Sequence, residues 1–171
     1  MPHNICAFLG KEAMIQGMAG DLKRKPINLT QGLSMMYLTE GLFDKLLKSH
    51  KKRADDALVF DNSDKFAYLA SHIICVLREY SVKGKIAYFE TCYHGGMGWQ
   101  SAVLFENGKP KLAVYTMDGE GIHEEDVEDK NLPLDEFAIN RILKEFGIKN
   151  LEEMDAFDSV GLANFRSMPE E

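Results

Sequence analysis

The chain has 171 residues, of which 45% are hydrophobic and 27% are charged, a balance typical of a globular protein with a buried core. Its net charge of -7 is unevenly spread: residues 1–60 carry 9 Lys and Arg against 6 Asp and Glu, whereas residues 61–171 carry 11 against 21. The acidic C-terminal part argues against nucleic acid as a partner, because such binding depends on cationic side chains that neutralise phosphates.

The apolar runs and the cysteines indicate in which cellular compartment the protein resides. The longest apolar runs, at 5–9 and 73–77, fall far short of the roughly 20 residues that a membrane-spanning helix needs. The N-terminus lacks the features of a secretory signal. The chain has three cysteines, Cys6, Cys75 and Cys92. Because their number is odd and no Cys-x-x-Cys pair occurs, we expect reduced thiols. We therefore expect a cytoplasmic protein without a membrane span and, since no linker is evident, one domain over residues 1–171.

Two short strands and a basic helix are predicted near the N-terminus. The β-favouring runs at 3–9 and 33–38 each predict a strand. Between residues 40 and 52, apolar residues recur at helical spacing while lysines occupy the other side, which predicts an amphipathic helix. Its basic outer face consists of Lys45, Lys48, Lys51, Lys52 and Arg53.

A long helix is predicted next. Residues 61–64 offer several N-cap side chains ahead of a segment whose apolar residues keep helical spacing as far as Tyr80. Because residues 74–76 add apolar side chains to its other side, we expect this helix, over 64–80, to be the central helix of the core.

Three antiparallel strands are predicted over residues 85–117. The segment from Lys85 is rich in aromatic and β-branched residues, and Asn107-Gly108 is the strongest two-residue hairpin signal. Pairing across that turn predicts Val103 opposite Leu112. Pro110 cannot donate to a sheet ladder, so the third strand is expected at an edge or after that residue. The face expected to meet the central helix carries Trp99, Val103, Phe105, Leu112 and Val114.

The remaining chain predicts a loop and a helix. Residues 118–136 hold nine acidic side chains and one lysine, which is typical of a solvated loop, and a helix over 134–146 ends before Gly147. The predicted fold is therefore α+β: a small antiparallel sheet, made of the meander at 85–117 and the N-terminal strands, packs against a central helix at 64–80, with a C-terminal helix at 134–146.

One set of residues on the first meander strand has the composition of a reactive site. Alternation along the strand places Glu90, Cys92 and His94 on one face, and a histidine base two residues away can activate a thiol. The alternative is structural: Cys92 serves as a small apolar residue, His94 ends the strand at the surface, and Glu90 faces water or a lysine. Glu90 and His94 start about 13 Å apart along a strand and cannot share a metal ion without a bend.

Neither a cofactor nor a metal is predicted. The loop Gly95-Gly96-Met97-Gly98 could present N–H groups to an anion, but phosphate-binding glycine loops open helices and this one opens a strand. A hairpin connection or bulge is the alternative. The acidic segment that begins at Asp118 lacks the calcium-loop pattern, because Ile122 and His123 occupy its fifth and sixth positions.

The segment from Phe89 to Ala102 resembles a pattern found in small uncharacterised bacterial proteins. That pattern reads Glu-Thr, an acidic residue, Tyr, one further residue, then Gly-Gly-x-Gly-x-Gln, and this chain has Cys92 in place of the acid. The family implies a folded unit and no named reaction. The motif positions are Glu90, Tyr93, Gly95, Gly96, Gly98 and Gln100. Of these, Tyr93, Gly95, Gly96, Gly98 and Gln100 are candidate ligand-binding residues. The tail resembles the same family in Ile139-Asn140-Arg141-Ile142-Leu143, Asp155-Ala156-Phe157-Asp158, Gly161-Leu162 and Phe165-Arg166.

Two functions follow as hypotheses. The first is a non-catalytic, immunity-like or regulatory module that binds a protein partner through the acidic loop 118–136. The second is a small cysteine-dependent hydrolase or transferase that uses Cys92 and His94, with Glu90 beside them. The sequence does not indicate the oligomeric state.

Overall fold

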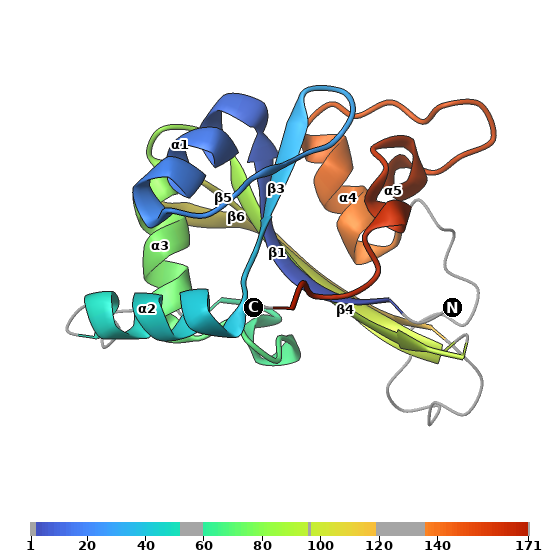
Figure 1. The fold of residues 1–171 in the computed structure, drawn as a ribbon. Coiled ribbons are helices and arrows are strands. Elements are labelled where there is room, and N and C mark those ends of the chain that lie inside the picture. The colour runs from blue at the N-terminus through green and yellow to red at the C-terminus, as the bar shows by residue number, and fades with distance from the viewer. Residues whose placement is uncertain (1–2, 52–59, 96, 119–135, 171) are drawn as a thin grey trace.

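The computed structural model describes residues 3–51, 60–95, 97–118 and 136–170, and these residues form an α+β fold, as predicted (Figure 1). Within them, one antiparallel sheet has the strand order β2-β3-β1-β4-β5-β6. The predicted meander is β4-β5-β6, and β1 joins it by pairing with β4, Phe8 opposite Tyr88. The strands are β1 (His3–Lys11), β2 (Ile27–Asn28), β3 (Leu33–Tyr37), β4 (Ile86–His94), β5 (Met97–Glu106) and β6 (Lys109–Asp118).

Helices cover both faces of the sheet (Figure 1). One face carries α1 (Glu12–Leu22), α2 (Glu40–His50) and α3 (Ser71–Ser81), and the other carries α4 (Ala138–Glu145) and α5 (Ala156–Ser159). Successive side chains of a strand point to opposite faces. Tyr88 therefore joins the core under α1–α3, while Phe89 joins the core under α4 and α5.

The C-terminal tail replaces β3 at one end of β1. β3 pairs with β1 from Ala7 onward, after which the chain turns away into α2. Beyond that point the N–H of Asn4 donates to the carbonyl of Arg166 at 2.8 Å, and Asn4 forms a parallel bridge with Ser167. This exchange of neighbours brings the tail beside the sheet, near the start of α2.

The predicted helix over 64–80 is wrong in its first half. Ser63–Lys65 form a single 3₁₀ turn, residues 66–70 are not helical, and α3 begins only at Ser71. The backbone N–H groups of Ala67 and Tyr68 donate to the Glu90 carboxylate instead. A buried acceptor on a distant strand therefore outweighs the local helical pattern.

Other helix boundaries also differ from the prediction. α4 begins at Ala138, with Phe137 as its N-cap, and the predicted start at 134–135 lies outside the described residues. α2 ends at His50, and residue 52 also lies outside the described part of the chain. Helix α1 was not predicted. Gly17 and Gly20 weaken its helix propensity, and the burial of Ile15 and Met18 against the sheet stabilises it.

The predicted register of the third meander strand is wrong by one residue. Val103 pairs with Ala113, and a register shift lies at Leu104/Phe105. The shift moves every following side chain of β6 to the opposite face. Leu112 and Val114 therefore pack toward α4 and α5, while Val103 and Phe105 pack toward α3. Pro110 does lie in β6, a terminal strand of the sheet.

A candidate binding pocket beside helix α2 and the tail

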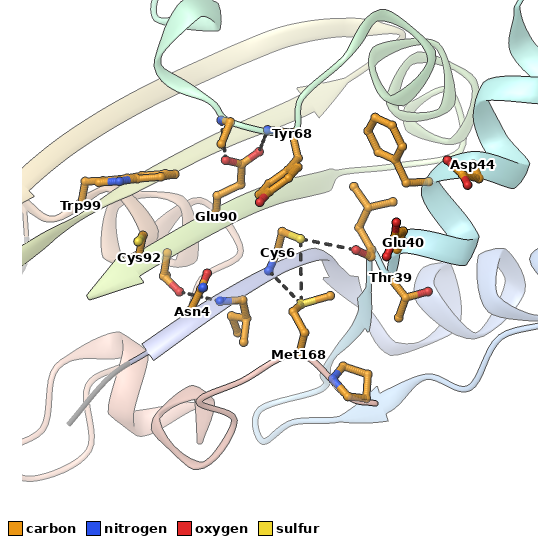
Figure 2. Close-up of a pocket in the computed structure, with 16 residues that line it drawn as sticks. Asn4, Cys6, Thr39, Glu40, Asp44, Tyr68, Glu90, Cys92, Trp99 and Met168 are labelled. Atoms are coloured by element: carbon orange, nitrogen blue, oxygen red, sulfur yellow. Dashed lines mark hydrogen bonds between the residues drawn. The ribbon is translucent and has the colours of Figure 1, made fainter. Parts of the chain in front are cut away.

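A pocket of about 920 Å³ lies between the sheet, the start of α2 and the C-terminal tail (Figure 2). We call it the tail pocket. Strands β1, β4 and β5 supply its floor, because the strands continue here beyond the end of β3. It is lined by Asn4, Ile5, Cys6, Leu38, Thr39, Glu40, Phe43, Asp44, Ala67, Tyr68, Glu90, Thr91, Cys92, Trp99, Met168 and Pro169.

Helix α2 presents two carboxylates and one aromatic ring to the pocket. Glu40, Phe43 and Asp44 lie three and four residues apart, which puts them on one side of the helix. The Thr39 hydroxyl caps the helix by accepting the N–H of Leu42 at 3.3 Å. This cap fixes the start of α2, and with it the positions of both acids, which are exposed to solvent.

Glu90 forms the buried end of the pocket floor. One carboxylate oxygen accepts the N–H of Ala67 at 2.7 Å, and the other accepts the N–H of Tyr68 at 2.8 Å and the hydroxyl of Tyr88 at 2.9 Å. The side chain is 1% exposed. Figure 2 shows the carboxylate directed at the two backbone nitrogens. The carboxylate thus holds residues 67 and 68 over the pocket.

Burial raises the pKa of Glu90 above its ordinary value of 4.5. The N–H groups of Ala67, Tyr68 and Leu69 and the Tyr88 hydroxyl act in the opposite direction, because they stabilise the charged form. Burial and the Glu90 charge also raise the pKa of Tyr88 well above 10, so its hydroxyl remains a donor. The two groups therefore form one coupled polar pair beneath the pocket.

Cys6 and Met168 join the tail to the sheet. The N–H of Cys6 lies 3.4 Å from the Met168 sulfur, and the Cys6 thiol donates to the Leu38 carbonyl at 3.4 Å (Figure 2). Burial, followed by the Glu90 charge, raises the pKa of Cys6 to about 12. A thiol with that pKa is almost entirely protonated near neutral pH, so Cys6 has the properties of a packing residue.

The tail pocket combines acidic groups with aromatic surfaces. Its carboxylates are Glu40, Asp44 and Glu90, and its rings are Phe43, Tyr68 and Trp99. Tyr68 is 56% exposed, so its ring is accessible to a partner at the pocket wall. Lys, Arg and His are missing from these lining residues. Carboxylates and ring faces both attract organic cations, so the pocket suits an ammonium or guanidinium group.

The predicted reactive trio is only partly brought together. Glu90 and Cys92 both line the tail pocket, and His94 does not. His94 is exposed at the end of β4, opposite Met97. In the described residues no hydrogen bond joins Cys92 to His94, and the Glu90 oxygens are already bonded to Ala67, Tyr68 and Tyr88.

The glycine-rich loop is a tight hairpin turn between β4 and β5. His94 pairs with Met97, and Gly95 lies in the turn between them, while residue 96 lies outside the described part of the chain. Gly95 has a φ of +64°, a conformation that favours glycine. Gly98 lies against the backbone of the opposite strand, where a Cβ atom would stand 2.7 Å from the Cα of Tyr93. The loop opens a strand, as the sequence indicated.

Two further motif residues lie on the opposite face of the sheet. Tyr93 and Gln100 line a second cavity, of about 260 Å³, which we call the small cavity. Strand alternation explains the division, since Glu90 and Cys92 are one residue out of phase with Tyr93. Thr91 borders both cavities. The small cavity is lined by His3, Thr91, Tyr93, Gln100, Phe157, Asp158, Ala163 and Arg166.

Several pocket residues carried no recognisable signal in the sequence. Glu40 and Asp44 belong to a helix whose pattern drew attention to its lysines, and Met168 belongs to a tail without periodicity. Tyr68 was expected within a helix. Within the described residues no three His, Cys, Asp or Glu side chains are grouped to hold a metal ion. Nor does any helix in that part of the chain have the length and apolar character required to cross a bilayer.

No protein-family model, curated protein or solved structure gives a match to this chain.

Proposed function

We propose that this chain is a non-catalytic protein-binding module of the cytoplasm, immunity-like or regulatory, whose tail pocket receives a basic side chain of a protein partner. The observation that carries the proposal is the lining of the pocket: its described residues include three carboxylates and three aromatic rings, and none of them is cationic. A Lys or Arg inserted there would contact ring faces and pair with Glu40 or Asp44. Buried cations and aromatic anchors are typical of strong contacts in protein interfaces.

The size and position of the pocket support a macromolecular partner. Its volume of about 920 Å³ exceeds what one side chain fills, and Tyr68 stands exposed on its wall. A partner would therefore fill the pocket with one side chain and neighbouring backbone. The acidic segment 119–135 lies outside the described residues, so a contact surface formed by loop 118–136 stays a prediction.

Partner capture tests the proposal. The protein, expressed in its natural host with an N-terminal tag on a long linker, is recovered gently and bound proteins are quantified by mass spectrometry. A C-terminal tag is unsuitable because Met168 and Pro169 line the pocket. The double variant Glu40→Gln/Asp44→Asn tests the pocket. The control is Glu152→Gln/Glu153→Gln, which changes the net charge equally at exposed residues outside the lining.

We expect a partner at equal abundance with the wild type and with the control, and at least about tenfold less with the pocket variant, which corresponds to 1.4 kcal/mol of binding free energy. Equal recovery with the pocket variant would refute the tail pocket as the contact site. Recovery of no stoichiometric partner by any form would refute the protein-binding function itself.

A cysteine-dependent hydrolase or transferase is the second candidate, and one observation favours it: Cys92 lines the tail pocket and is only partly buried. His94 would have to serve as the base, although it lies outside the lining. A rate of Cys92 alkylation above that of a free cysteine between pH 5 and 9, reduced in His94→Gln, would support this reaction class. An ordinary rate would remove it.

A further inference from the structure

The small cavity lies on the face of the sheet opposite the tail pocket, between the ends of β1, β4 and β5 on one side and α5 with the segment that follows it on the other. Its volume is about 260 Å³. Two apolar residues, Phe157 and Ala163, form part of its wall, and the other part consists of polar and charged groups. The cavity therefore has the size and the mixed lining of a site for a small polar molecule.

A buried histidine lines this cavity and keeps one nitrogen without a hydrogen bond. His3 Nδ1 bonds to the Thr91 hydroxyl at 2.7 Å, and the ring packs edge-on against Phe157 at 5.3 Å. Its Nε2 is buried and has no partner within the described residues. Burial lowers the pKa of His3, an effect that the Leu162 carbonyl opposes and the Arg166 charge reinforces. A buried polar atom left unpaired destabilises the fold, and a ligand that bonds to it removes that cost.

Two opposite charges line the cavity without neutralising each other. Arg166 and Asp158 both belong to the lining, yet neither makes an ion pair within the described residues. Their backbones are fixed independently: the Arg166 carbonyl accepts the N–H of Asn4 at 2.8 Å, and the Asp158 N–H donates to the Asp155 carboxylate at 2.9 Å. The cavity thus presents a cation and an anion at once, both on residues that are exposed to solvent.

Gln100 adds an oriented donor. Its side-chain oxygen accepts the N–H of Ile139 at 3.2 Å, at the start of α4. That bond assigns the oxygen to α4 and leaves the amide NH₂ as the group available to the cavity. Beside the Arg166 guanidinium, this NH₂ completes a set of donors suited to a carboxylate.

We propose that the small cavity binds a free α-amino acid, whose carboxylate contacts Arg166 and Gln100, whose ammonium contacts Asp158, and whose small apolar side chain lies against Phe157 and Ala163. An α-amino acid carries both charges on neighbouring atoms, and it is the common small molecule that requires a cation and an anion in one cavity. The His3 Nε2 gains a hydrogen bond to the ligand. This site is separate from the tail pocket and does not depend on its partner.

Calorimetry and saturation-transfer NMR on the untagged chain test the proposal with the twenty free amino acids, added singly at up to about 10 mM. For each one that binds, the N-acetyl derivative and the amide are compared, because the first lacks the ammonium and the second lacks the carboxylate. Arg166→Gln and Asp158→Asn each remove one charge, and Glu153→Gln is the control. The Arg166 side chain makes no hydrogen bond within the described residues, so the variant should keep its fold, which circular dichroism verifies.

The expected result is saturable binding of at least one small amino acid, weakened at least about tenfold by either variant and by either blocked derivative. Binding by the control variant should be unchanged. The proposal is overturned if no free amino acid binds. It is also overturned if a blocked derivative binds as well as its parent amino acid, since the ligand would then be a peptide terminus. Binding that is unchanged in both charge variants would overturn it as well.

Discussion

The carboxylate of Glu90 accepts the backbone N–H of Tyr68 at 2.8 Å, across 22 residues of sequence. This bond, together with that from Ala67, shortens the predicted helix and places residues 67 and 68 above the pocket floor. One buried acid therefore determines both a departure from the local sequence pattern and the shape of the tail pocket.

Replacing Glu90 should destabilise the fold. In Glu90→Gln the amide NH₂ must face one of the backbone N–H donors, so at least one part-buried donor loses its acceptor and the NH₂ is left buried without one, at a cost of about 1–3 kcal/mol. Urea unfolding followed by circular dichroism measures the change. The matched variant Glu79→Gln, on the exposed side of α3, should cost much less because the His50–Glu79 pair is near the surface.

The same variant should change the pH dependence of stability. The pKa of Glu90 is raised in the folded protein, so the folded state binds more protons than the unfolded state above pH 4.5. Stability contributed by Glu90 therefore falls as the pH rises from that value through the raised pKa, and is constant beyond it. The destabilisation caused by Glu90→Gln should accordingly be larger near pH 4.5 than at pH 8. A difference that grows with pH would contradict the direction of this shift.

The thiols should differ in reactivity. With a pKa of about 12, Cys6 holds roughly a thousandfold less thiolate at pH 8 than an ordinary cysteine, and Met168 covers it. Iodoacetamide labelling, read by mass spectrometry of the cysteine peptides, should modify the half-buried Cys92 long before Cys6. Met168→Ala should speed the labelling of Cys6 and leave Cys92 unchanged. Equal rates for both thiols in the wild type would contradict the burial of Cys6 beneath the tail.

Gly98 should be intolerant of substitution. A Cβ atom at this position would overlap the Cys92 carbonyl and stand 2.7 Å from the Cα of Tyr93, so Gly98→Ala should destabilise the chain by about 1–3 kcal/mol. The control is Gly17→Ala in α1, where nothing lies within 4 Å of the added atom. That change should stabilise by about 0.5–1 kcal/mol, because alanine favours helix. Thermal unfolding distinguishes the two. If both variants unfold at the wild-type midpoint temperature, the close contact between Gly98 and the backbone of the opposite strand is wrong.

Local patterns were sufficient to predict the three meander strands, the basic helix and the turn at Asn107-Gly108. They failed where a distant group decided the outcome: the Glu90 carboxylate ended the predicted helix, and the shift at Leu104/Phe105 changed the faces of Leu112 and Val114. Helix α1 was missed because tertiary burial compensates for its glycines.

The candidate site was predicted in part for a similar reason. Alternation correctly put Glu90 and Cys92 on one face, but only the folded chain brings them beside α2 and a tail more than seventy residues away. Asp158 and Arg166 stood in the segments that resemble the bacterial family, although nothing in the sequence placed them beside His3. Such long-range proximity leaves no periodic signal in the chain.

The most direct test of the central claim uses Trp99, the single tryptophan of the chain, which lines the tail pocket. Its fluorescence is followed during titration with N-acetyl-arginine amide, and with the neutral isostere N-acetyl-citrulline amide as the control. We predict a saturable change with the arginine derivative, at a dissociation constant on the order of 1 mM for so small a ligand. The change should be absent with citrulline and in Glu40→Gln/Asp44→Asn. An equal response to both compounds, or none to either, would contradict the claim that this pocket receives a basic side chain.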